Sequence, residues 1–338
     1  MTYTLASLSD LPGLAARLPA ADTAAAEGAR ARQNSLTKPP GSLGRLEEIA
    51  EFMATWRATV RPEIWRAQAL VFAGNHGICA QGVNPYPQEV TAQMVANFQA
   101  GGAAINQLCR VNGADLNVIA LDLDQPTADF TEGPAMTEVE TLEALNRGAA
   151  AVDEGADILI LGEMGIGNST VAAALASACF GGAARDWVGP GTGSDTAGIA
   201  RKVGAIERGL ALHAGTKGDA GAILAALGGR EQAAICGAVL AARAARVPVI
   251  LDGFICTAAA AVLAVADPRL LDHCLVGHAS AEPGHRKLLA AIGKRPVLEF
   301  DMRLGEGSGA ALALGIVRSA LACHNGMATF GEAGVSEA

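Results

Sequence analysis

Two glutamates in glycine-rich segments are the residues of this chain best suited to chemistry. Glu163 follows a glycine, and Glu306 lies between two glycines. Small neighbours let a carboxylate lie against backbone and ligand, where loss of water raises its pKa toward the range of a general base. Either glutamate could instead accept the N–H groups that begin a neighbouring helix. If both flank one substrate, they could act as base and charge stabiliser at an electrophilic sugar carbon, like the paired acids of glycoside hydrolysis.

The segment around Glu163 also predicts a phosphate-binding turn. An apolar run at 158–161 ends in a turn that contains Gly165 and Gly167, and an alanine-rich helical segment follows. A strand, a glycine turn and a helix start direct free backbone N–H groups at an anion. The turn fits the Walker A pattern except that Asn168 replaces the lysine, which argues against a nucleoside triphosphate and leaves a monophosphate. The alternative is a tight turn that only joins strand to helix.

Covalent and metal chemistry find little support in the sequence. Ser169 lacks the flanking pattern of a nucleophile elbow. The spacing of Cys274, His278 and His285 matches no usual zinc pattern. Lys202, on a helical segment after a glycine-rich turn, is either a phosphate partner or an ordinary solvated lysine.

Composition narrows the class of protein. The 338 residues suggest one large domain with an accessory piece, and 51% hydrophobic but only 4% aromatic residues predict a core of small side chains. A net charge of −9 without a basic cluster makes nucleic acid and anionic membranes poor partners. Seven cysteines without a C-x-x-C pair, and no evident signal peptide or membrane-spanning run, predict a cytoplasmic protein.

An alternation of strands and helices must position these residues. Six short apolar runs between helical segments predict an α/β fold with a mostly parallel, doubly wound, Rossmann-like sheet. The expected strands are 67–73, 116–121, 158–161, 247–251, 273–276 and 297–300. Ligands of such sheets bind outside the carboxyl ends of the strands. The polar and glycine signals fall at those ends: Asn75, His76, Asp122, Glu163, Asp252, Gly253, His278, Ser280 and Glu306.

Helical periodicity completes the expected fold. Residues 1–65 are expected to be helical apart from a break at 38–41, with Ser42 capping a helix over 43–57. Ser280 is expected to cap another helix that has a proline in its first turn. Further helices are expected at 88–109, 137–151, 220–227, 230–245 and 310–323.

Seven short stretches along the chain form a specific combination. They are KPPGSLGRLE (38–47), PQEVT (87–91), GEMGIGN (162–168), VGPGTG (188–193), VILDGFI (249–255), SAEPGH (280–285) and RLGEGSGAA (303–311). In this order they resemble the nicotinate-nucleotide–dimethylbenzimidazole phosphoribosyltransferase family, which assembles the lower ligand of cobalamin. The resemblance covers almost the whole chain.

The resemblance implies a reaction and a set of site residues. Nicotinate mononucleotide and 5,6-dimethylbenzimidazole would give α-ribazole 5′-phosphate and nicotinate, with inversion at C1′ and without a metal or redox cofactor. Glu306 matches the family's general base, and Glu163 matches a second functional glutamate. Gln88 falls where the family meets the benzimidazole, and Leu304 offers apolar cover for that base. The positions that match the phosphate and ribose contacts are Gly165, Gly167, Lys202, Gly253 and Ser280.

The family's architecture implies a large α/β domain over 66–306 and a small helical domain made of 1–65 with 307–338, working as a homodimer. The chain departs from the family pattern in two places. Asn75 stands where many members carry aspartate, and Arg230 stands where an apolar residue is expected.

Other functions fit part of the pattern. The doubly wound sheet with Gly165-x-Gly167 could serve an NAD-dependent oxidoreductase, which would change the absorbance of NAD. A pyrophosphate-driven phosphoribosyltransferase would need a paired-acid loop that is not visible. A non-catalytic mononucleotide-binding protein would show no turnover whatever happens to Glu306. The natural base stays open among dimethylbenzimidazole, other benzimidazoles and adenine.

Overall fold

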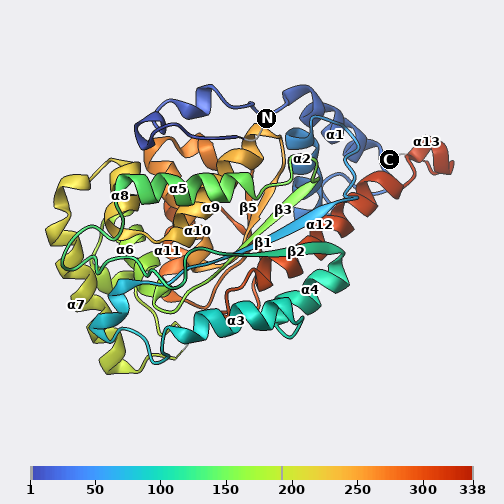
Figure 1. The fold of residues 1–338 in the computed structure, drawn as a ribbon. Helices are drawn as coiled ribbons and strands as arrows, with labels where there is room; N and C mark the ends of the chain where they lie inside the picture. The colour runs from blue at the N-terminus through green and yellow to red at the C-terminus, as the bar shows by residue number, and fades with distance from the viewer. Residues whose placement is uncertain (1–2, 192, 337–338) are drawn as a thin grey trace.

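A six-stranded parallel sheet forms the centre of the molecule (Figure 1). The computed structural model describes residues 3–191 and 193–336. The strand order is β2-β1-β3-β4-β5-β6, and every neighbouring pair in it is parallel. The strands are β1 (Ala67–Ala73), β2 (Ala114–Ala120), β3 (Ile158–Met164), β4 (Val249–Leu251), β5 (Cys274–His278) and β6 (Pro296–Leu298). The predicted α/β fold is confirmed, and the strand order, which the sequence left open, reverses between β1 and β3.

Helices cover both faces of this sheet (Figure 1). Successive side chains of a strand point to opposite faces. The helices are α1 (Thr23–Ser35), α2 (Arg45–Arg57), α3 (Glu89–Gln99), α4 (Ala104–Asn112), α5 (Glu138–Ala150), α6 (Asn168–Phe180), α7 (Thr196–Leu212), α8 (Ala220–Leu227), α9 (Arg230–Ala244), α10 (Phe254–Ala266), α11 (Pro283–Ala291), α12 (Ser308–Gly326) and α13 (Phe330–Ala333). Because the side chains of β3 alternate between the faces, Leu159 and Leu161 join one apolar cluster with α5, α6, α8, α9 and α10. Ile158 and Ile160 join another cluster with α2, α3, α4 and α12. In the described ranges, no helix combines the length and apolarity needed to cross a bilayer.

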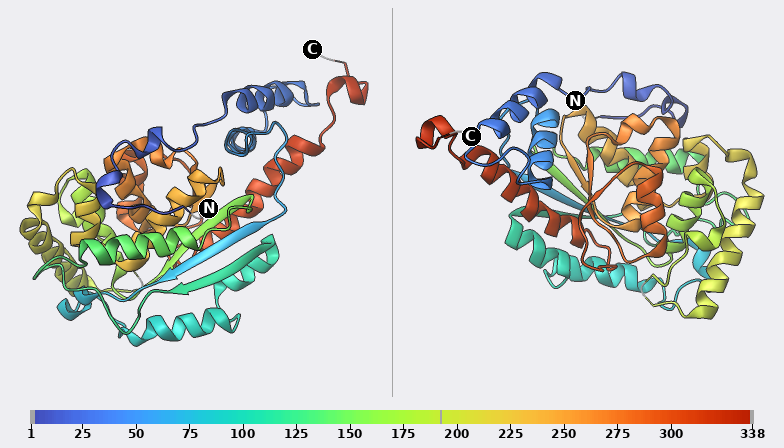
Figure 2. Two further views of the ribbon diagram at one scale, coloured as in Figure 1. Left: turned by 45° about the horizontal axis from the view of Figure 1, so that its top comes forward. Right: turned by 180° about the vertical axis from the view of Figure 1, so that it is seen from behind.

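Helix α1, near the start of the chain, lies beside the end of α12, near the end of the chain (Figure 2). The guanidinium of Arg32 on α1 donates to the carbonyl oxygen of Asn325, near the end of α12, at 3.1 Å. The first half of α12 packs on the sheet, and its second half extends toward α1 and α2 (Figure 2). From these contacts we propose that α1, α2 and the second half of α12 form the small helical domain predicted for 1–65 with 307–338, beside a large domain over 66–306. Leu5 and Leu8, in contrast, pack in the apolar cluster of the large domain.

One predicted helix is divided in two. The single helix expected over 88–109 is wrong, because residues 100–103 separate α3 from α4. Gly101 has a φ of +79°, a left-handed conformation that interrupts a helix. A Cβ atom on Gly102 would collide with the side chain of Asn97. The two adjacent glycines therefore make the turn.

The N-terminal region is less helical than expected. Among the described residues before α1, helical structure is limited to two short 3₁₀ turns. Ser42 does not cap α2, whose N-cap is Gly44 with a φ of +52°. Instead the Glu47 carboxylate in the first turn accepts the N–H of Leu43 at 2.9 Å. A side chain inside the helix thus replaces the expected cap.

The contact between α5 and α9 depends on glycine. A Cβ atom on Gly148 would collide with the carbonyl group of Ala234, and one on Gly237 would collide with that of Leu145. The two helix backbones therefore touch, which only residues without a side chain permit.

We expect Gly237→Ala to lower the free energy of unfolding by about 1–3 kcal/mol, because an added methyl group must force the two helices apart. Urea unfolding followed by circular dichroism measures the change. Gly215→Ala is the matched control, since no atom lies within 4 Å of its Cβ position. An unchanged midpoint for Gly237→Ala would mean that α5 and α9 lie further apart than described.

Candidate active site

A cavity at the carboxyl ends of β3, β4 and β5 collects most of the predicted site residues. Parallel strands end at one edge of the sheet, so the loops that follow them meet there. The predicted residues in its lining are Glu163, Gly165, Gly167, Asn168, Lys202, Gly253, Ser280, Leu304 and Glu306. Tyr86, Glu282 and Arg303 also line it, and sequence reasoning did not single them out.

Four residues expected at this edge of the sheet do not line this cavity: Asn75, His76, Gln88 and Asp122. The amide of Gln88 donates to the carbonyl oxygen of His76. Asp122 is exposed and forms an ion pair with Arg147 at 2.7 Å. It follows the edge strand β2, which is two strands away from β3, and the expectation that it joins the site is wrong.

A buried hydrogen-bonded pair, His76 and Glu231, lies behind the glycine turn. His76 Nε2 is 2.6 Å from Glu231 Oε1, and neither side chain is exposed. A Cβ atom on Gly165 would lie 3.0 Å from both of these atoms, so glycine lets the turn pass over the pair. The partners are 155 positions apart, and no sequence pattern connects them.

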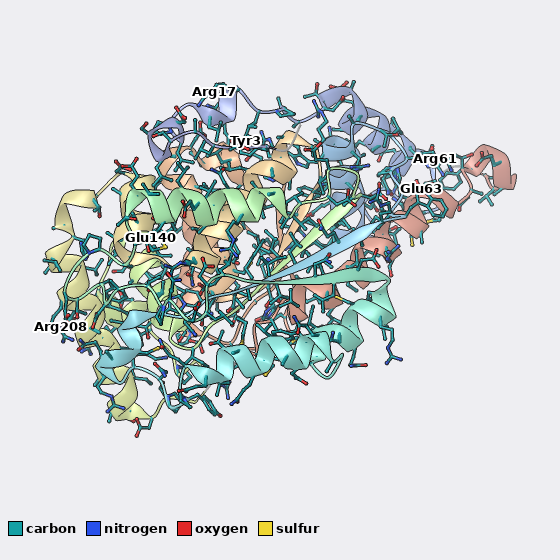
Figure 3. The ribbon with its side chains drawn as sticks, viewed as in Figure 1. Tyr3, Arg17, Arg61, Glu63, Glu140 and Arg208 are labelled. Atoms are coloured by element: carbon teal, nitrogen blue, oxygen red, sulfur yellow. The ribbon has the colours of Figure 1, made fainter. Side chains whose placement is uncertain are left out.

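Helix α7 holds another wall of the cavity. Arg208 donates to the side-chain oxygen of Gln81 at 2.7 Å, and Arg201 donates to the carbonyl oxygen of Gly82 at 2.7 Å. Figure 3 shows Arg208 beside the turn that contains Gln81. Because Lys202 follows Arg201, one helix positions both this loop and a buried cation.

The polar side of the cavity suits an anion. Lys202 is only 3% exposed, and its ammonium donates to the Ser169 hydroxyl at 3.1 Å and to the Gly189 carbonyl at 3.3 Å. Helices α6 and α10 begin at the cavity with Gly167 and Gly253 as N-caps, and neither has a side-chain cap. Uncapped helix starts carry free N–H groups and a partial positive charge. Lys202 is therefore a buried lysine at the cavity, and the solvated alternative is wrong.

Glu282 interacts with Lys202 and with the backbone of Gly191 at the polar side of the cavity. Burial lowers the pKa of Lys202, and the charge of Glu282 raises it. Glu282 Oε1 accepts the N–H of Gly191 at 2.9 Å. Glu282, and not Ser280, is the N-cap of α11, so the predicted cap is wrong by two positions. Instead the Ser280 hydroxyl accepts the N–H of Glu282 at 3.3 Å and lines the cavity.

Glu306 has a conformation that is unusual for a residue other than glycine. Its φ of +66° lies in the left-handed region, between Gly305 at +84° and Gly307 at +83°. Such a conformation costs on the order of 1–3 kcal/mol and persists where surrounding contacts enforce it. The residue is 7% exposed. Burial, and then the charge of Asp252, raises the pKa of Glu306 to about 7.

Glu163 is more deeply buried and differs in protonation. It is 4% exposed, and the amide of Asn168 donates to its carboxylate. Burial and the neighbouring carboxylates of Asp252, Glu231 and Glu306 raise the pKa of Glu163 to about 8. The Asn168 bond opposes this shift. Near pH 7 Glu306 can therefore accept a proton, and Glu163, which has the higher pKa, gives up its proton less readily.

An apolar hollow opens beside Glu306. Its lining consists of Tyr86, Val90, Met94, Met164, Ile166, Arg303, Leu304 and Glu306. Met164 ends β3, Ile166 lies in the glycine turn, and Val90 and Met94 come from α3. Apolar walls with adaptable methionines suit a flat aromatic ring. Glu306 belongs to both the hollow and the polar cavity.

Known proteins resemble this chain over nearly all of its length. Residues 18–335 match a family model described as "Phosphoribosyltransferase". The nicotinate-nucleotide–dimethylbenzimidazole phosphoribosyltransferase of Rhodobacter capsulatus is 70% identical over 98% of this chain and 99% of its own. The protein of that name from Ruegeria pomeroyi is 59% identical over 98% of each chain. A crystal structure of the Thermus thermophilus enzyme has a TM-score of 0.87 at 41% identity, covering 94% of this chain and all of the other. The chain belongs to the nicotinate-nucleotide–dimethylbenzimidazole phosphoribosyltransferase family.

Proposed function

We propose that the protein transfers the 5-phosphoribosyl group of nicotinate mononucleotide to 5,6-dimethylbenzimidazole, giving α-ribazole 5′-phosphate and nicotinate. The curated relatives carry the name of this reaction. One observation supports the proposal most: Glu306, a buried carboxylate with a pKa of about 7, belongs to both an anion-binding cavity and an apolar hollow. The two substrates need those two environments with a base between them.

The chemistry needs one proton acceptor. The pyridine nitrogen of nicotinate mononucleotide is cationic, so nicotinate leaves with the electrons of the C1′–N bond. A benzimidazole nitrogen attacks C1′ from the opposite face, which inverts the configuration from β to α. The other ring nitrogen then loses its N–H proton, and in our proposal the Glu306 carboxylate takes it.

Each substrate group has a proposed partner. The phosphate is bound by Lys202, by the Ser169 hydroxyl and by the free N–H groups at the starts of α6 and α10. Protonated Glu163 donates to the ribose. Leu304 covers the benzimidazole in the apolar hollow. Gln88 is the proposed polar residue on the benzimidazole side of the site. The remaining proposed ribose and phosphate contacts are Gly165, Gly167, Asn168, Gly253 and Ser280.

We further propose that the protein works as a homodimer in the cytoplasm. All seven cysteines are free thiols, as expected for a reducing compartment. Trp65 is 80% exposed and lies beside the second half of α12. An exposed aromatic side chain of this size is typical of an interface. A two-fold pair would bury this patch twice.

A direct assay tests the proposed reaction. The protein is incubated with nicotinate mononucleotide and a panel of bases that includes dimethylbenzimidazole, other benzimidazoles and adenine. Products are identified by mass and by anomeric configuration. Nicotinate release with an α-riboside is the expected outcome. Nucleotide binding without any product would support a non-catalytic binding protein.

Glu306→Gln should lower kcat by about 10²–10⁴-fold, because the amide keeps the shape of the side chain but cannot accept the proton. Affinity for nicotinate mononucleotide should change little. Steady-state kinetics and calorimetry measure the two effects. Glu299→Gln changes an exposed glutamate and is the matched control. A Glu306→Gln protein with near-normal turnover would move the base elsewhere, with Glu163 as the next candidate.

The pH dependence of kcat/KM follows from the same group. Burial raises the pKa of Glu306 from 4.5 to about 7, and only the ionised form accepts a proton, so the rate should rise with pH through about 7. It should fall again above about pH 8, where Glu163, the proposed donor to the ribose, loses its proton. Initial rates between pH 5 and 9 measure the profile in the wild type. A rate that is flat from pH 5 to 8 would contradict this role.

Lys202→Gln should weaken binding of nicotinate mononucleotide by about 10–100-fold, since a hydrogen bond to a charged group contributes about 1.5–3 kcal/mol. Nicotinate riboside, which lacks the phosphate, should bind both proteins equally. Calorimetry measures both ligands, with Lys217→Gln as an exposed control. Equal losses for nucleotide and riboside would show that Lys202 does not bind the phosphate.

A further inference from the structure

Asp252 joins the end of β4 to the turn that carries Glu306. It is 1% exposed and lies directly after β4. Its Oδ2 atom accepts the N–H of Gly307 at 3.1 Å, and its Oδ1 atom accepts the N–H of Ala310 at 3.0 Å. Gly307 follows Glu306 in the chain, so this one carboxylate holds both sides of the first turn of α12.

Backbone contacts set the direction of the Glu306 side chain. Within the described ranges, no hydrogen bond or ion pair holds the carboxylate itself. The N–H of Glu306 donates to the carbonyl oxygen of Glu163 at 3.2 Å, and the Ser308 hydroxyl donates to that of Gly305 at 2.7 Å. Because the turn imposes a left-handed φ, it also determines where the side chain points. Asp252 fastens this turn to the sheet.

Asp252 is also a charge beside Glu306. The titratable groups around the two come from four neighbouring elements: Glu163 from β3, His278 from β5, Cys256 from α10 and Arg303 from the loop before α12. His278 Nε2 lies 3.6 Å from Asp252 Oδ1. Burial raises the pKa of Asp252, whereas His278 and the N–H donors of α12 oppose that shift and favour its charged form.

We propose that Asp252 is a positioning residue for the transfer reaction: it aims Glu306 through the first turn of α12, and its charge tunes the proton affinity of Glu306. The inference rests on the proposed function, in which Glu306 is the base. Each oxygen of Asp252 accepts one backbone N–H at the start of α12, which ties the carboxylate to the turn that carries Glu306. Asp252 also lines the cavity, so the test must separate an action through Glu306 from a direct contact with the substrates. A carboxylate that only capped α12 would contribute to stability alone.

Asp252→Asn is the first test. Asparagine keeps the shape and one acceptor oxygen, but it turns an NH₂ group toward one of the α12 donors. We expect kcat to fall by about 10–100-fold, the cost of displacing a catalytic group by about 1 Å. KM for the nucleotide should stay within about threefold. The acid limb of the pH profile should move to lower pH, because loss of a neighbouring negative charge favours ionised Glu306. A normal kcat with an unmoved profile would overturn the proposal.

A double-mutant cycle separates this role from an independent one. If Asp252 acts only through Glu306, adding Asp252→Asn to Glu306→Gln should cost little more than Glu306→Gln alone. Effects of the two substitutions that multiply would mean that Asp252 acts on its own. A fully active Glu306→Gln protein would refute the proposed base instead, so the two failures are distinguishable.

Two further variants complete the design. Asp122→Asn is the matched control, because Asp122 also follows a strand but is exposed and outside the cavity. It should leave kcat and the pH profile unchanged. Asp252→Ser, which keeps a small acceptor, serves if the asparagine variant does not fold. It should show the same loss of kcat and the same shift of the acid limb, and normal values of both would count against the proposal.

Discussion

Three carboxylates share one buried edge of the sheet, and like charges in a dry environment cannot all be ionised at little cost. The three carboxylates receive different numbers of hydrogen-bond donors, and they therefore differ in how readily they ionise. Asp252 receives two backbone N–H groups from α12, which favour its charge. Glu163 receives one side-chain amide and is more buried than Glu306, so its pKa is the higher of the two, at about 8. Glu306 faces the apolar hollow with a pKa of about 7. In this account Asp252 fixes the turn before α12, Glu163 serves as the proton donor and Glu306 serves as the base. The positive charge of Lys202 makes the polar side of the cavity favourable for an anion.

Close backbone approach makes this grouping possible. A Cβ atom on Gly162 would collide with the backbone of Gly307, which presses the end of β3 against the turn before α12. A Cβ atom on Gly309 would collide with the His278 ring, so that imidazole packs directly on the first turn of α12. The same principle operates far from the site, where α5 and α9 touch through Gly237. Such contacts require small residues, and the sequence has 41 glycines but only 4% aromatic residues.

Local patterns predicted most of the elements, because a strand or helix depends mainly on its own residues. The strand at 67–73 and the helix at 220–227 were predicted with the bounds that the structure gives. Periodicity alone did not reveal the break at Gly101, since the flanking residues continue one helical pattern. The sequence placed Glu163 and Glu306 at the edge of the sheet but not their difference in pKa, which arises from neighbours distant in the chain. The His76–Glu231 pair and the bonds from α12 to Asp252 are likewise tertiary and leave no sequence signal.

A structure of the complex with α-ribazole 5′-phosphate would test the role of Glu306 most directly. The decisive distance is that between the Glu306 carboxylate and the benzimidazole nitrogen that is not bonded to the ribose. We expect this distance to be about 2.6–3.2 Å, the range of a hydrogen bond, with the phosphate beside Lys202. A carboxylate that points away from the bound base, or another side chain within hydrogen-bond distance of that nitrogen, would contradict the assignment of Glu306 as the base.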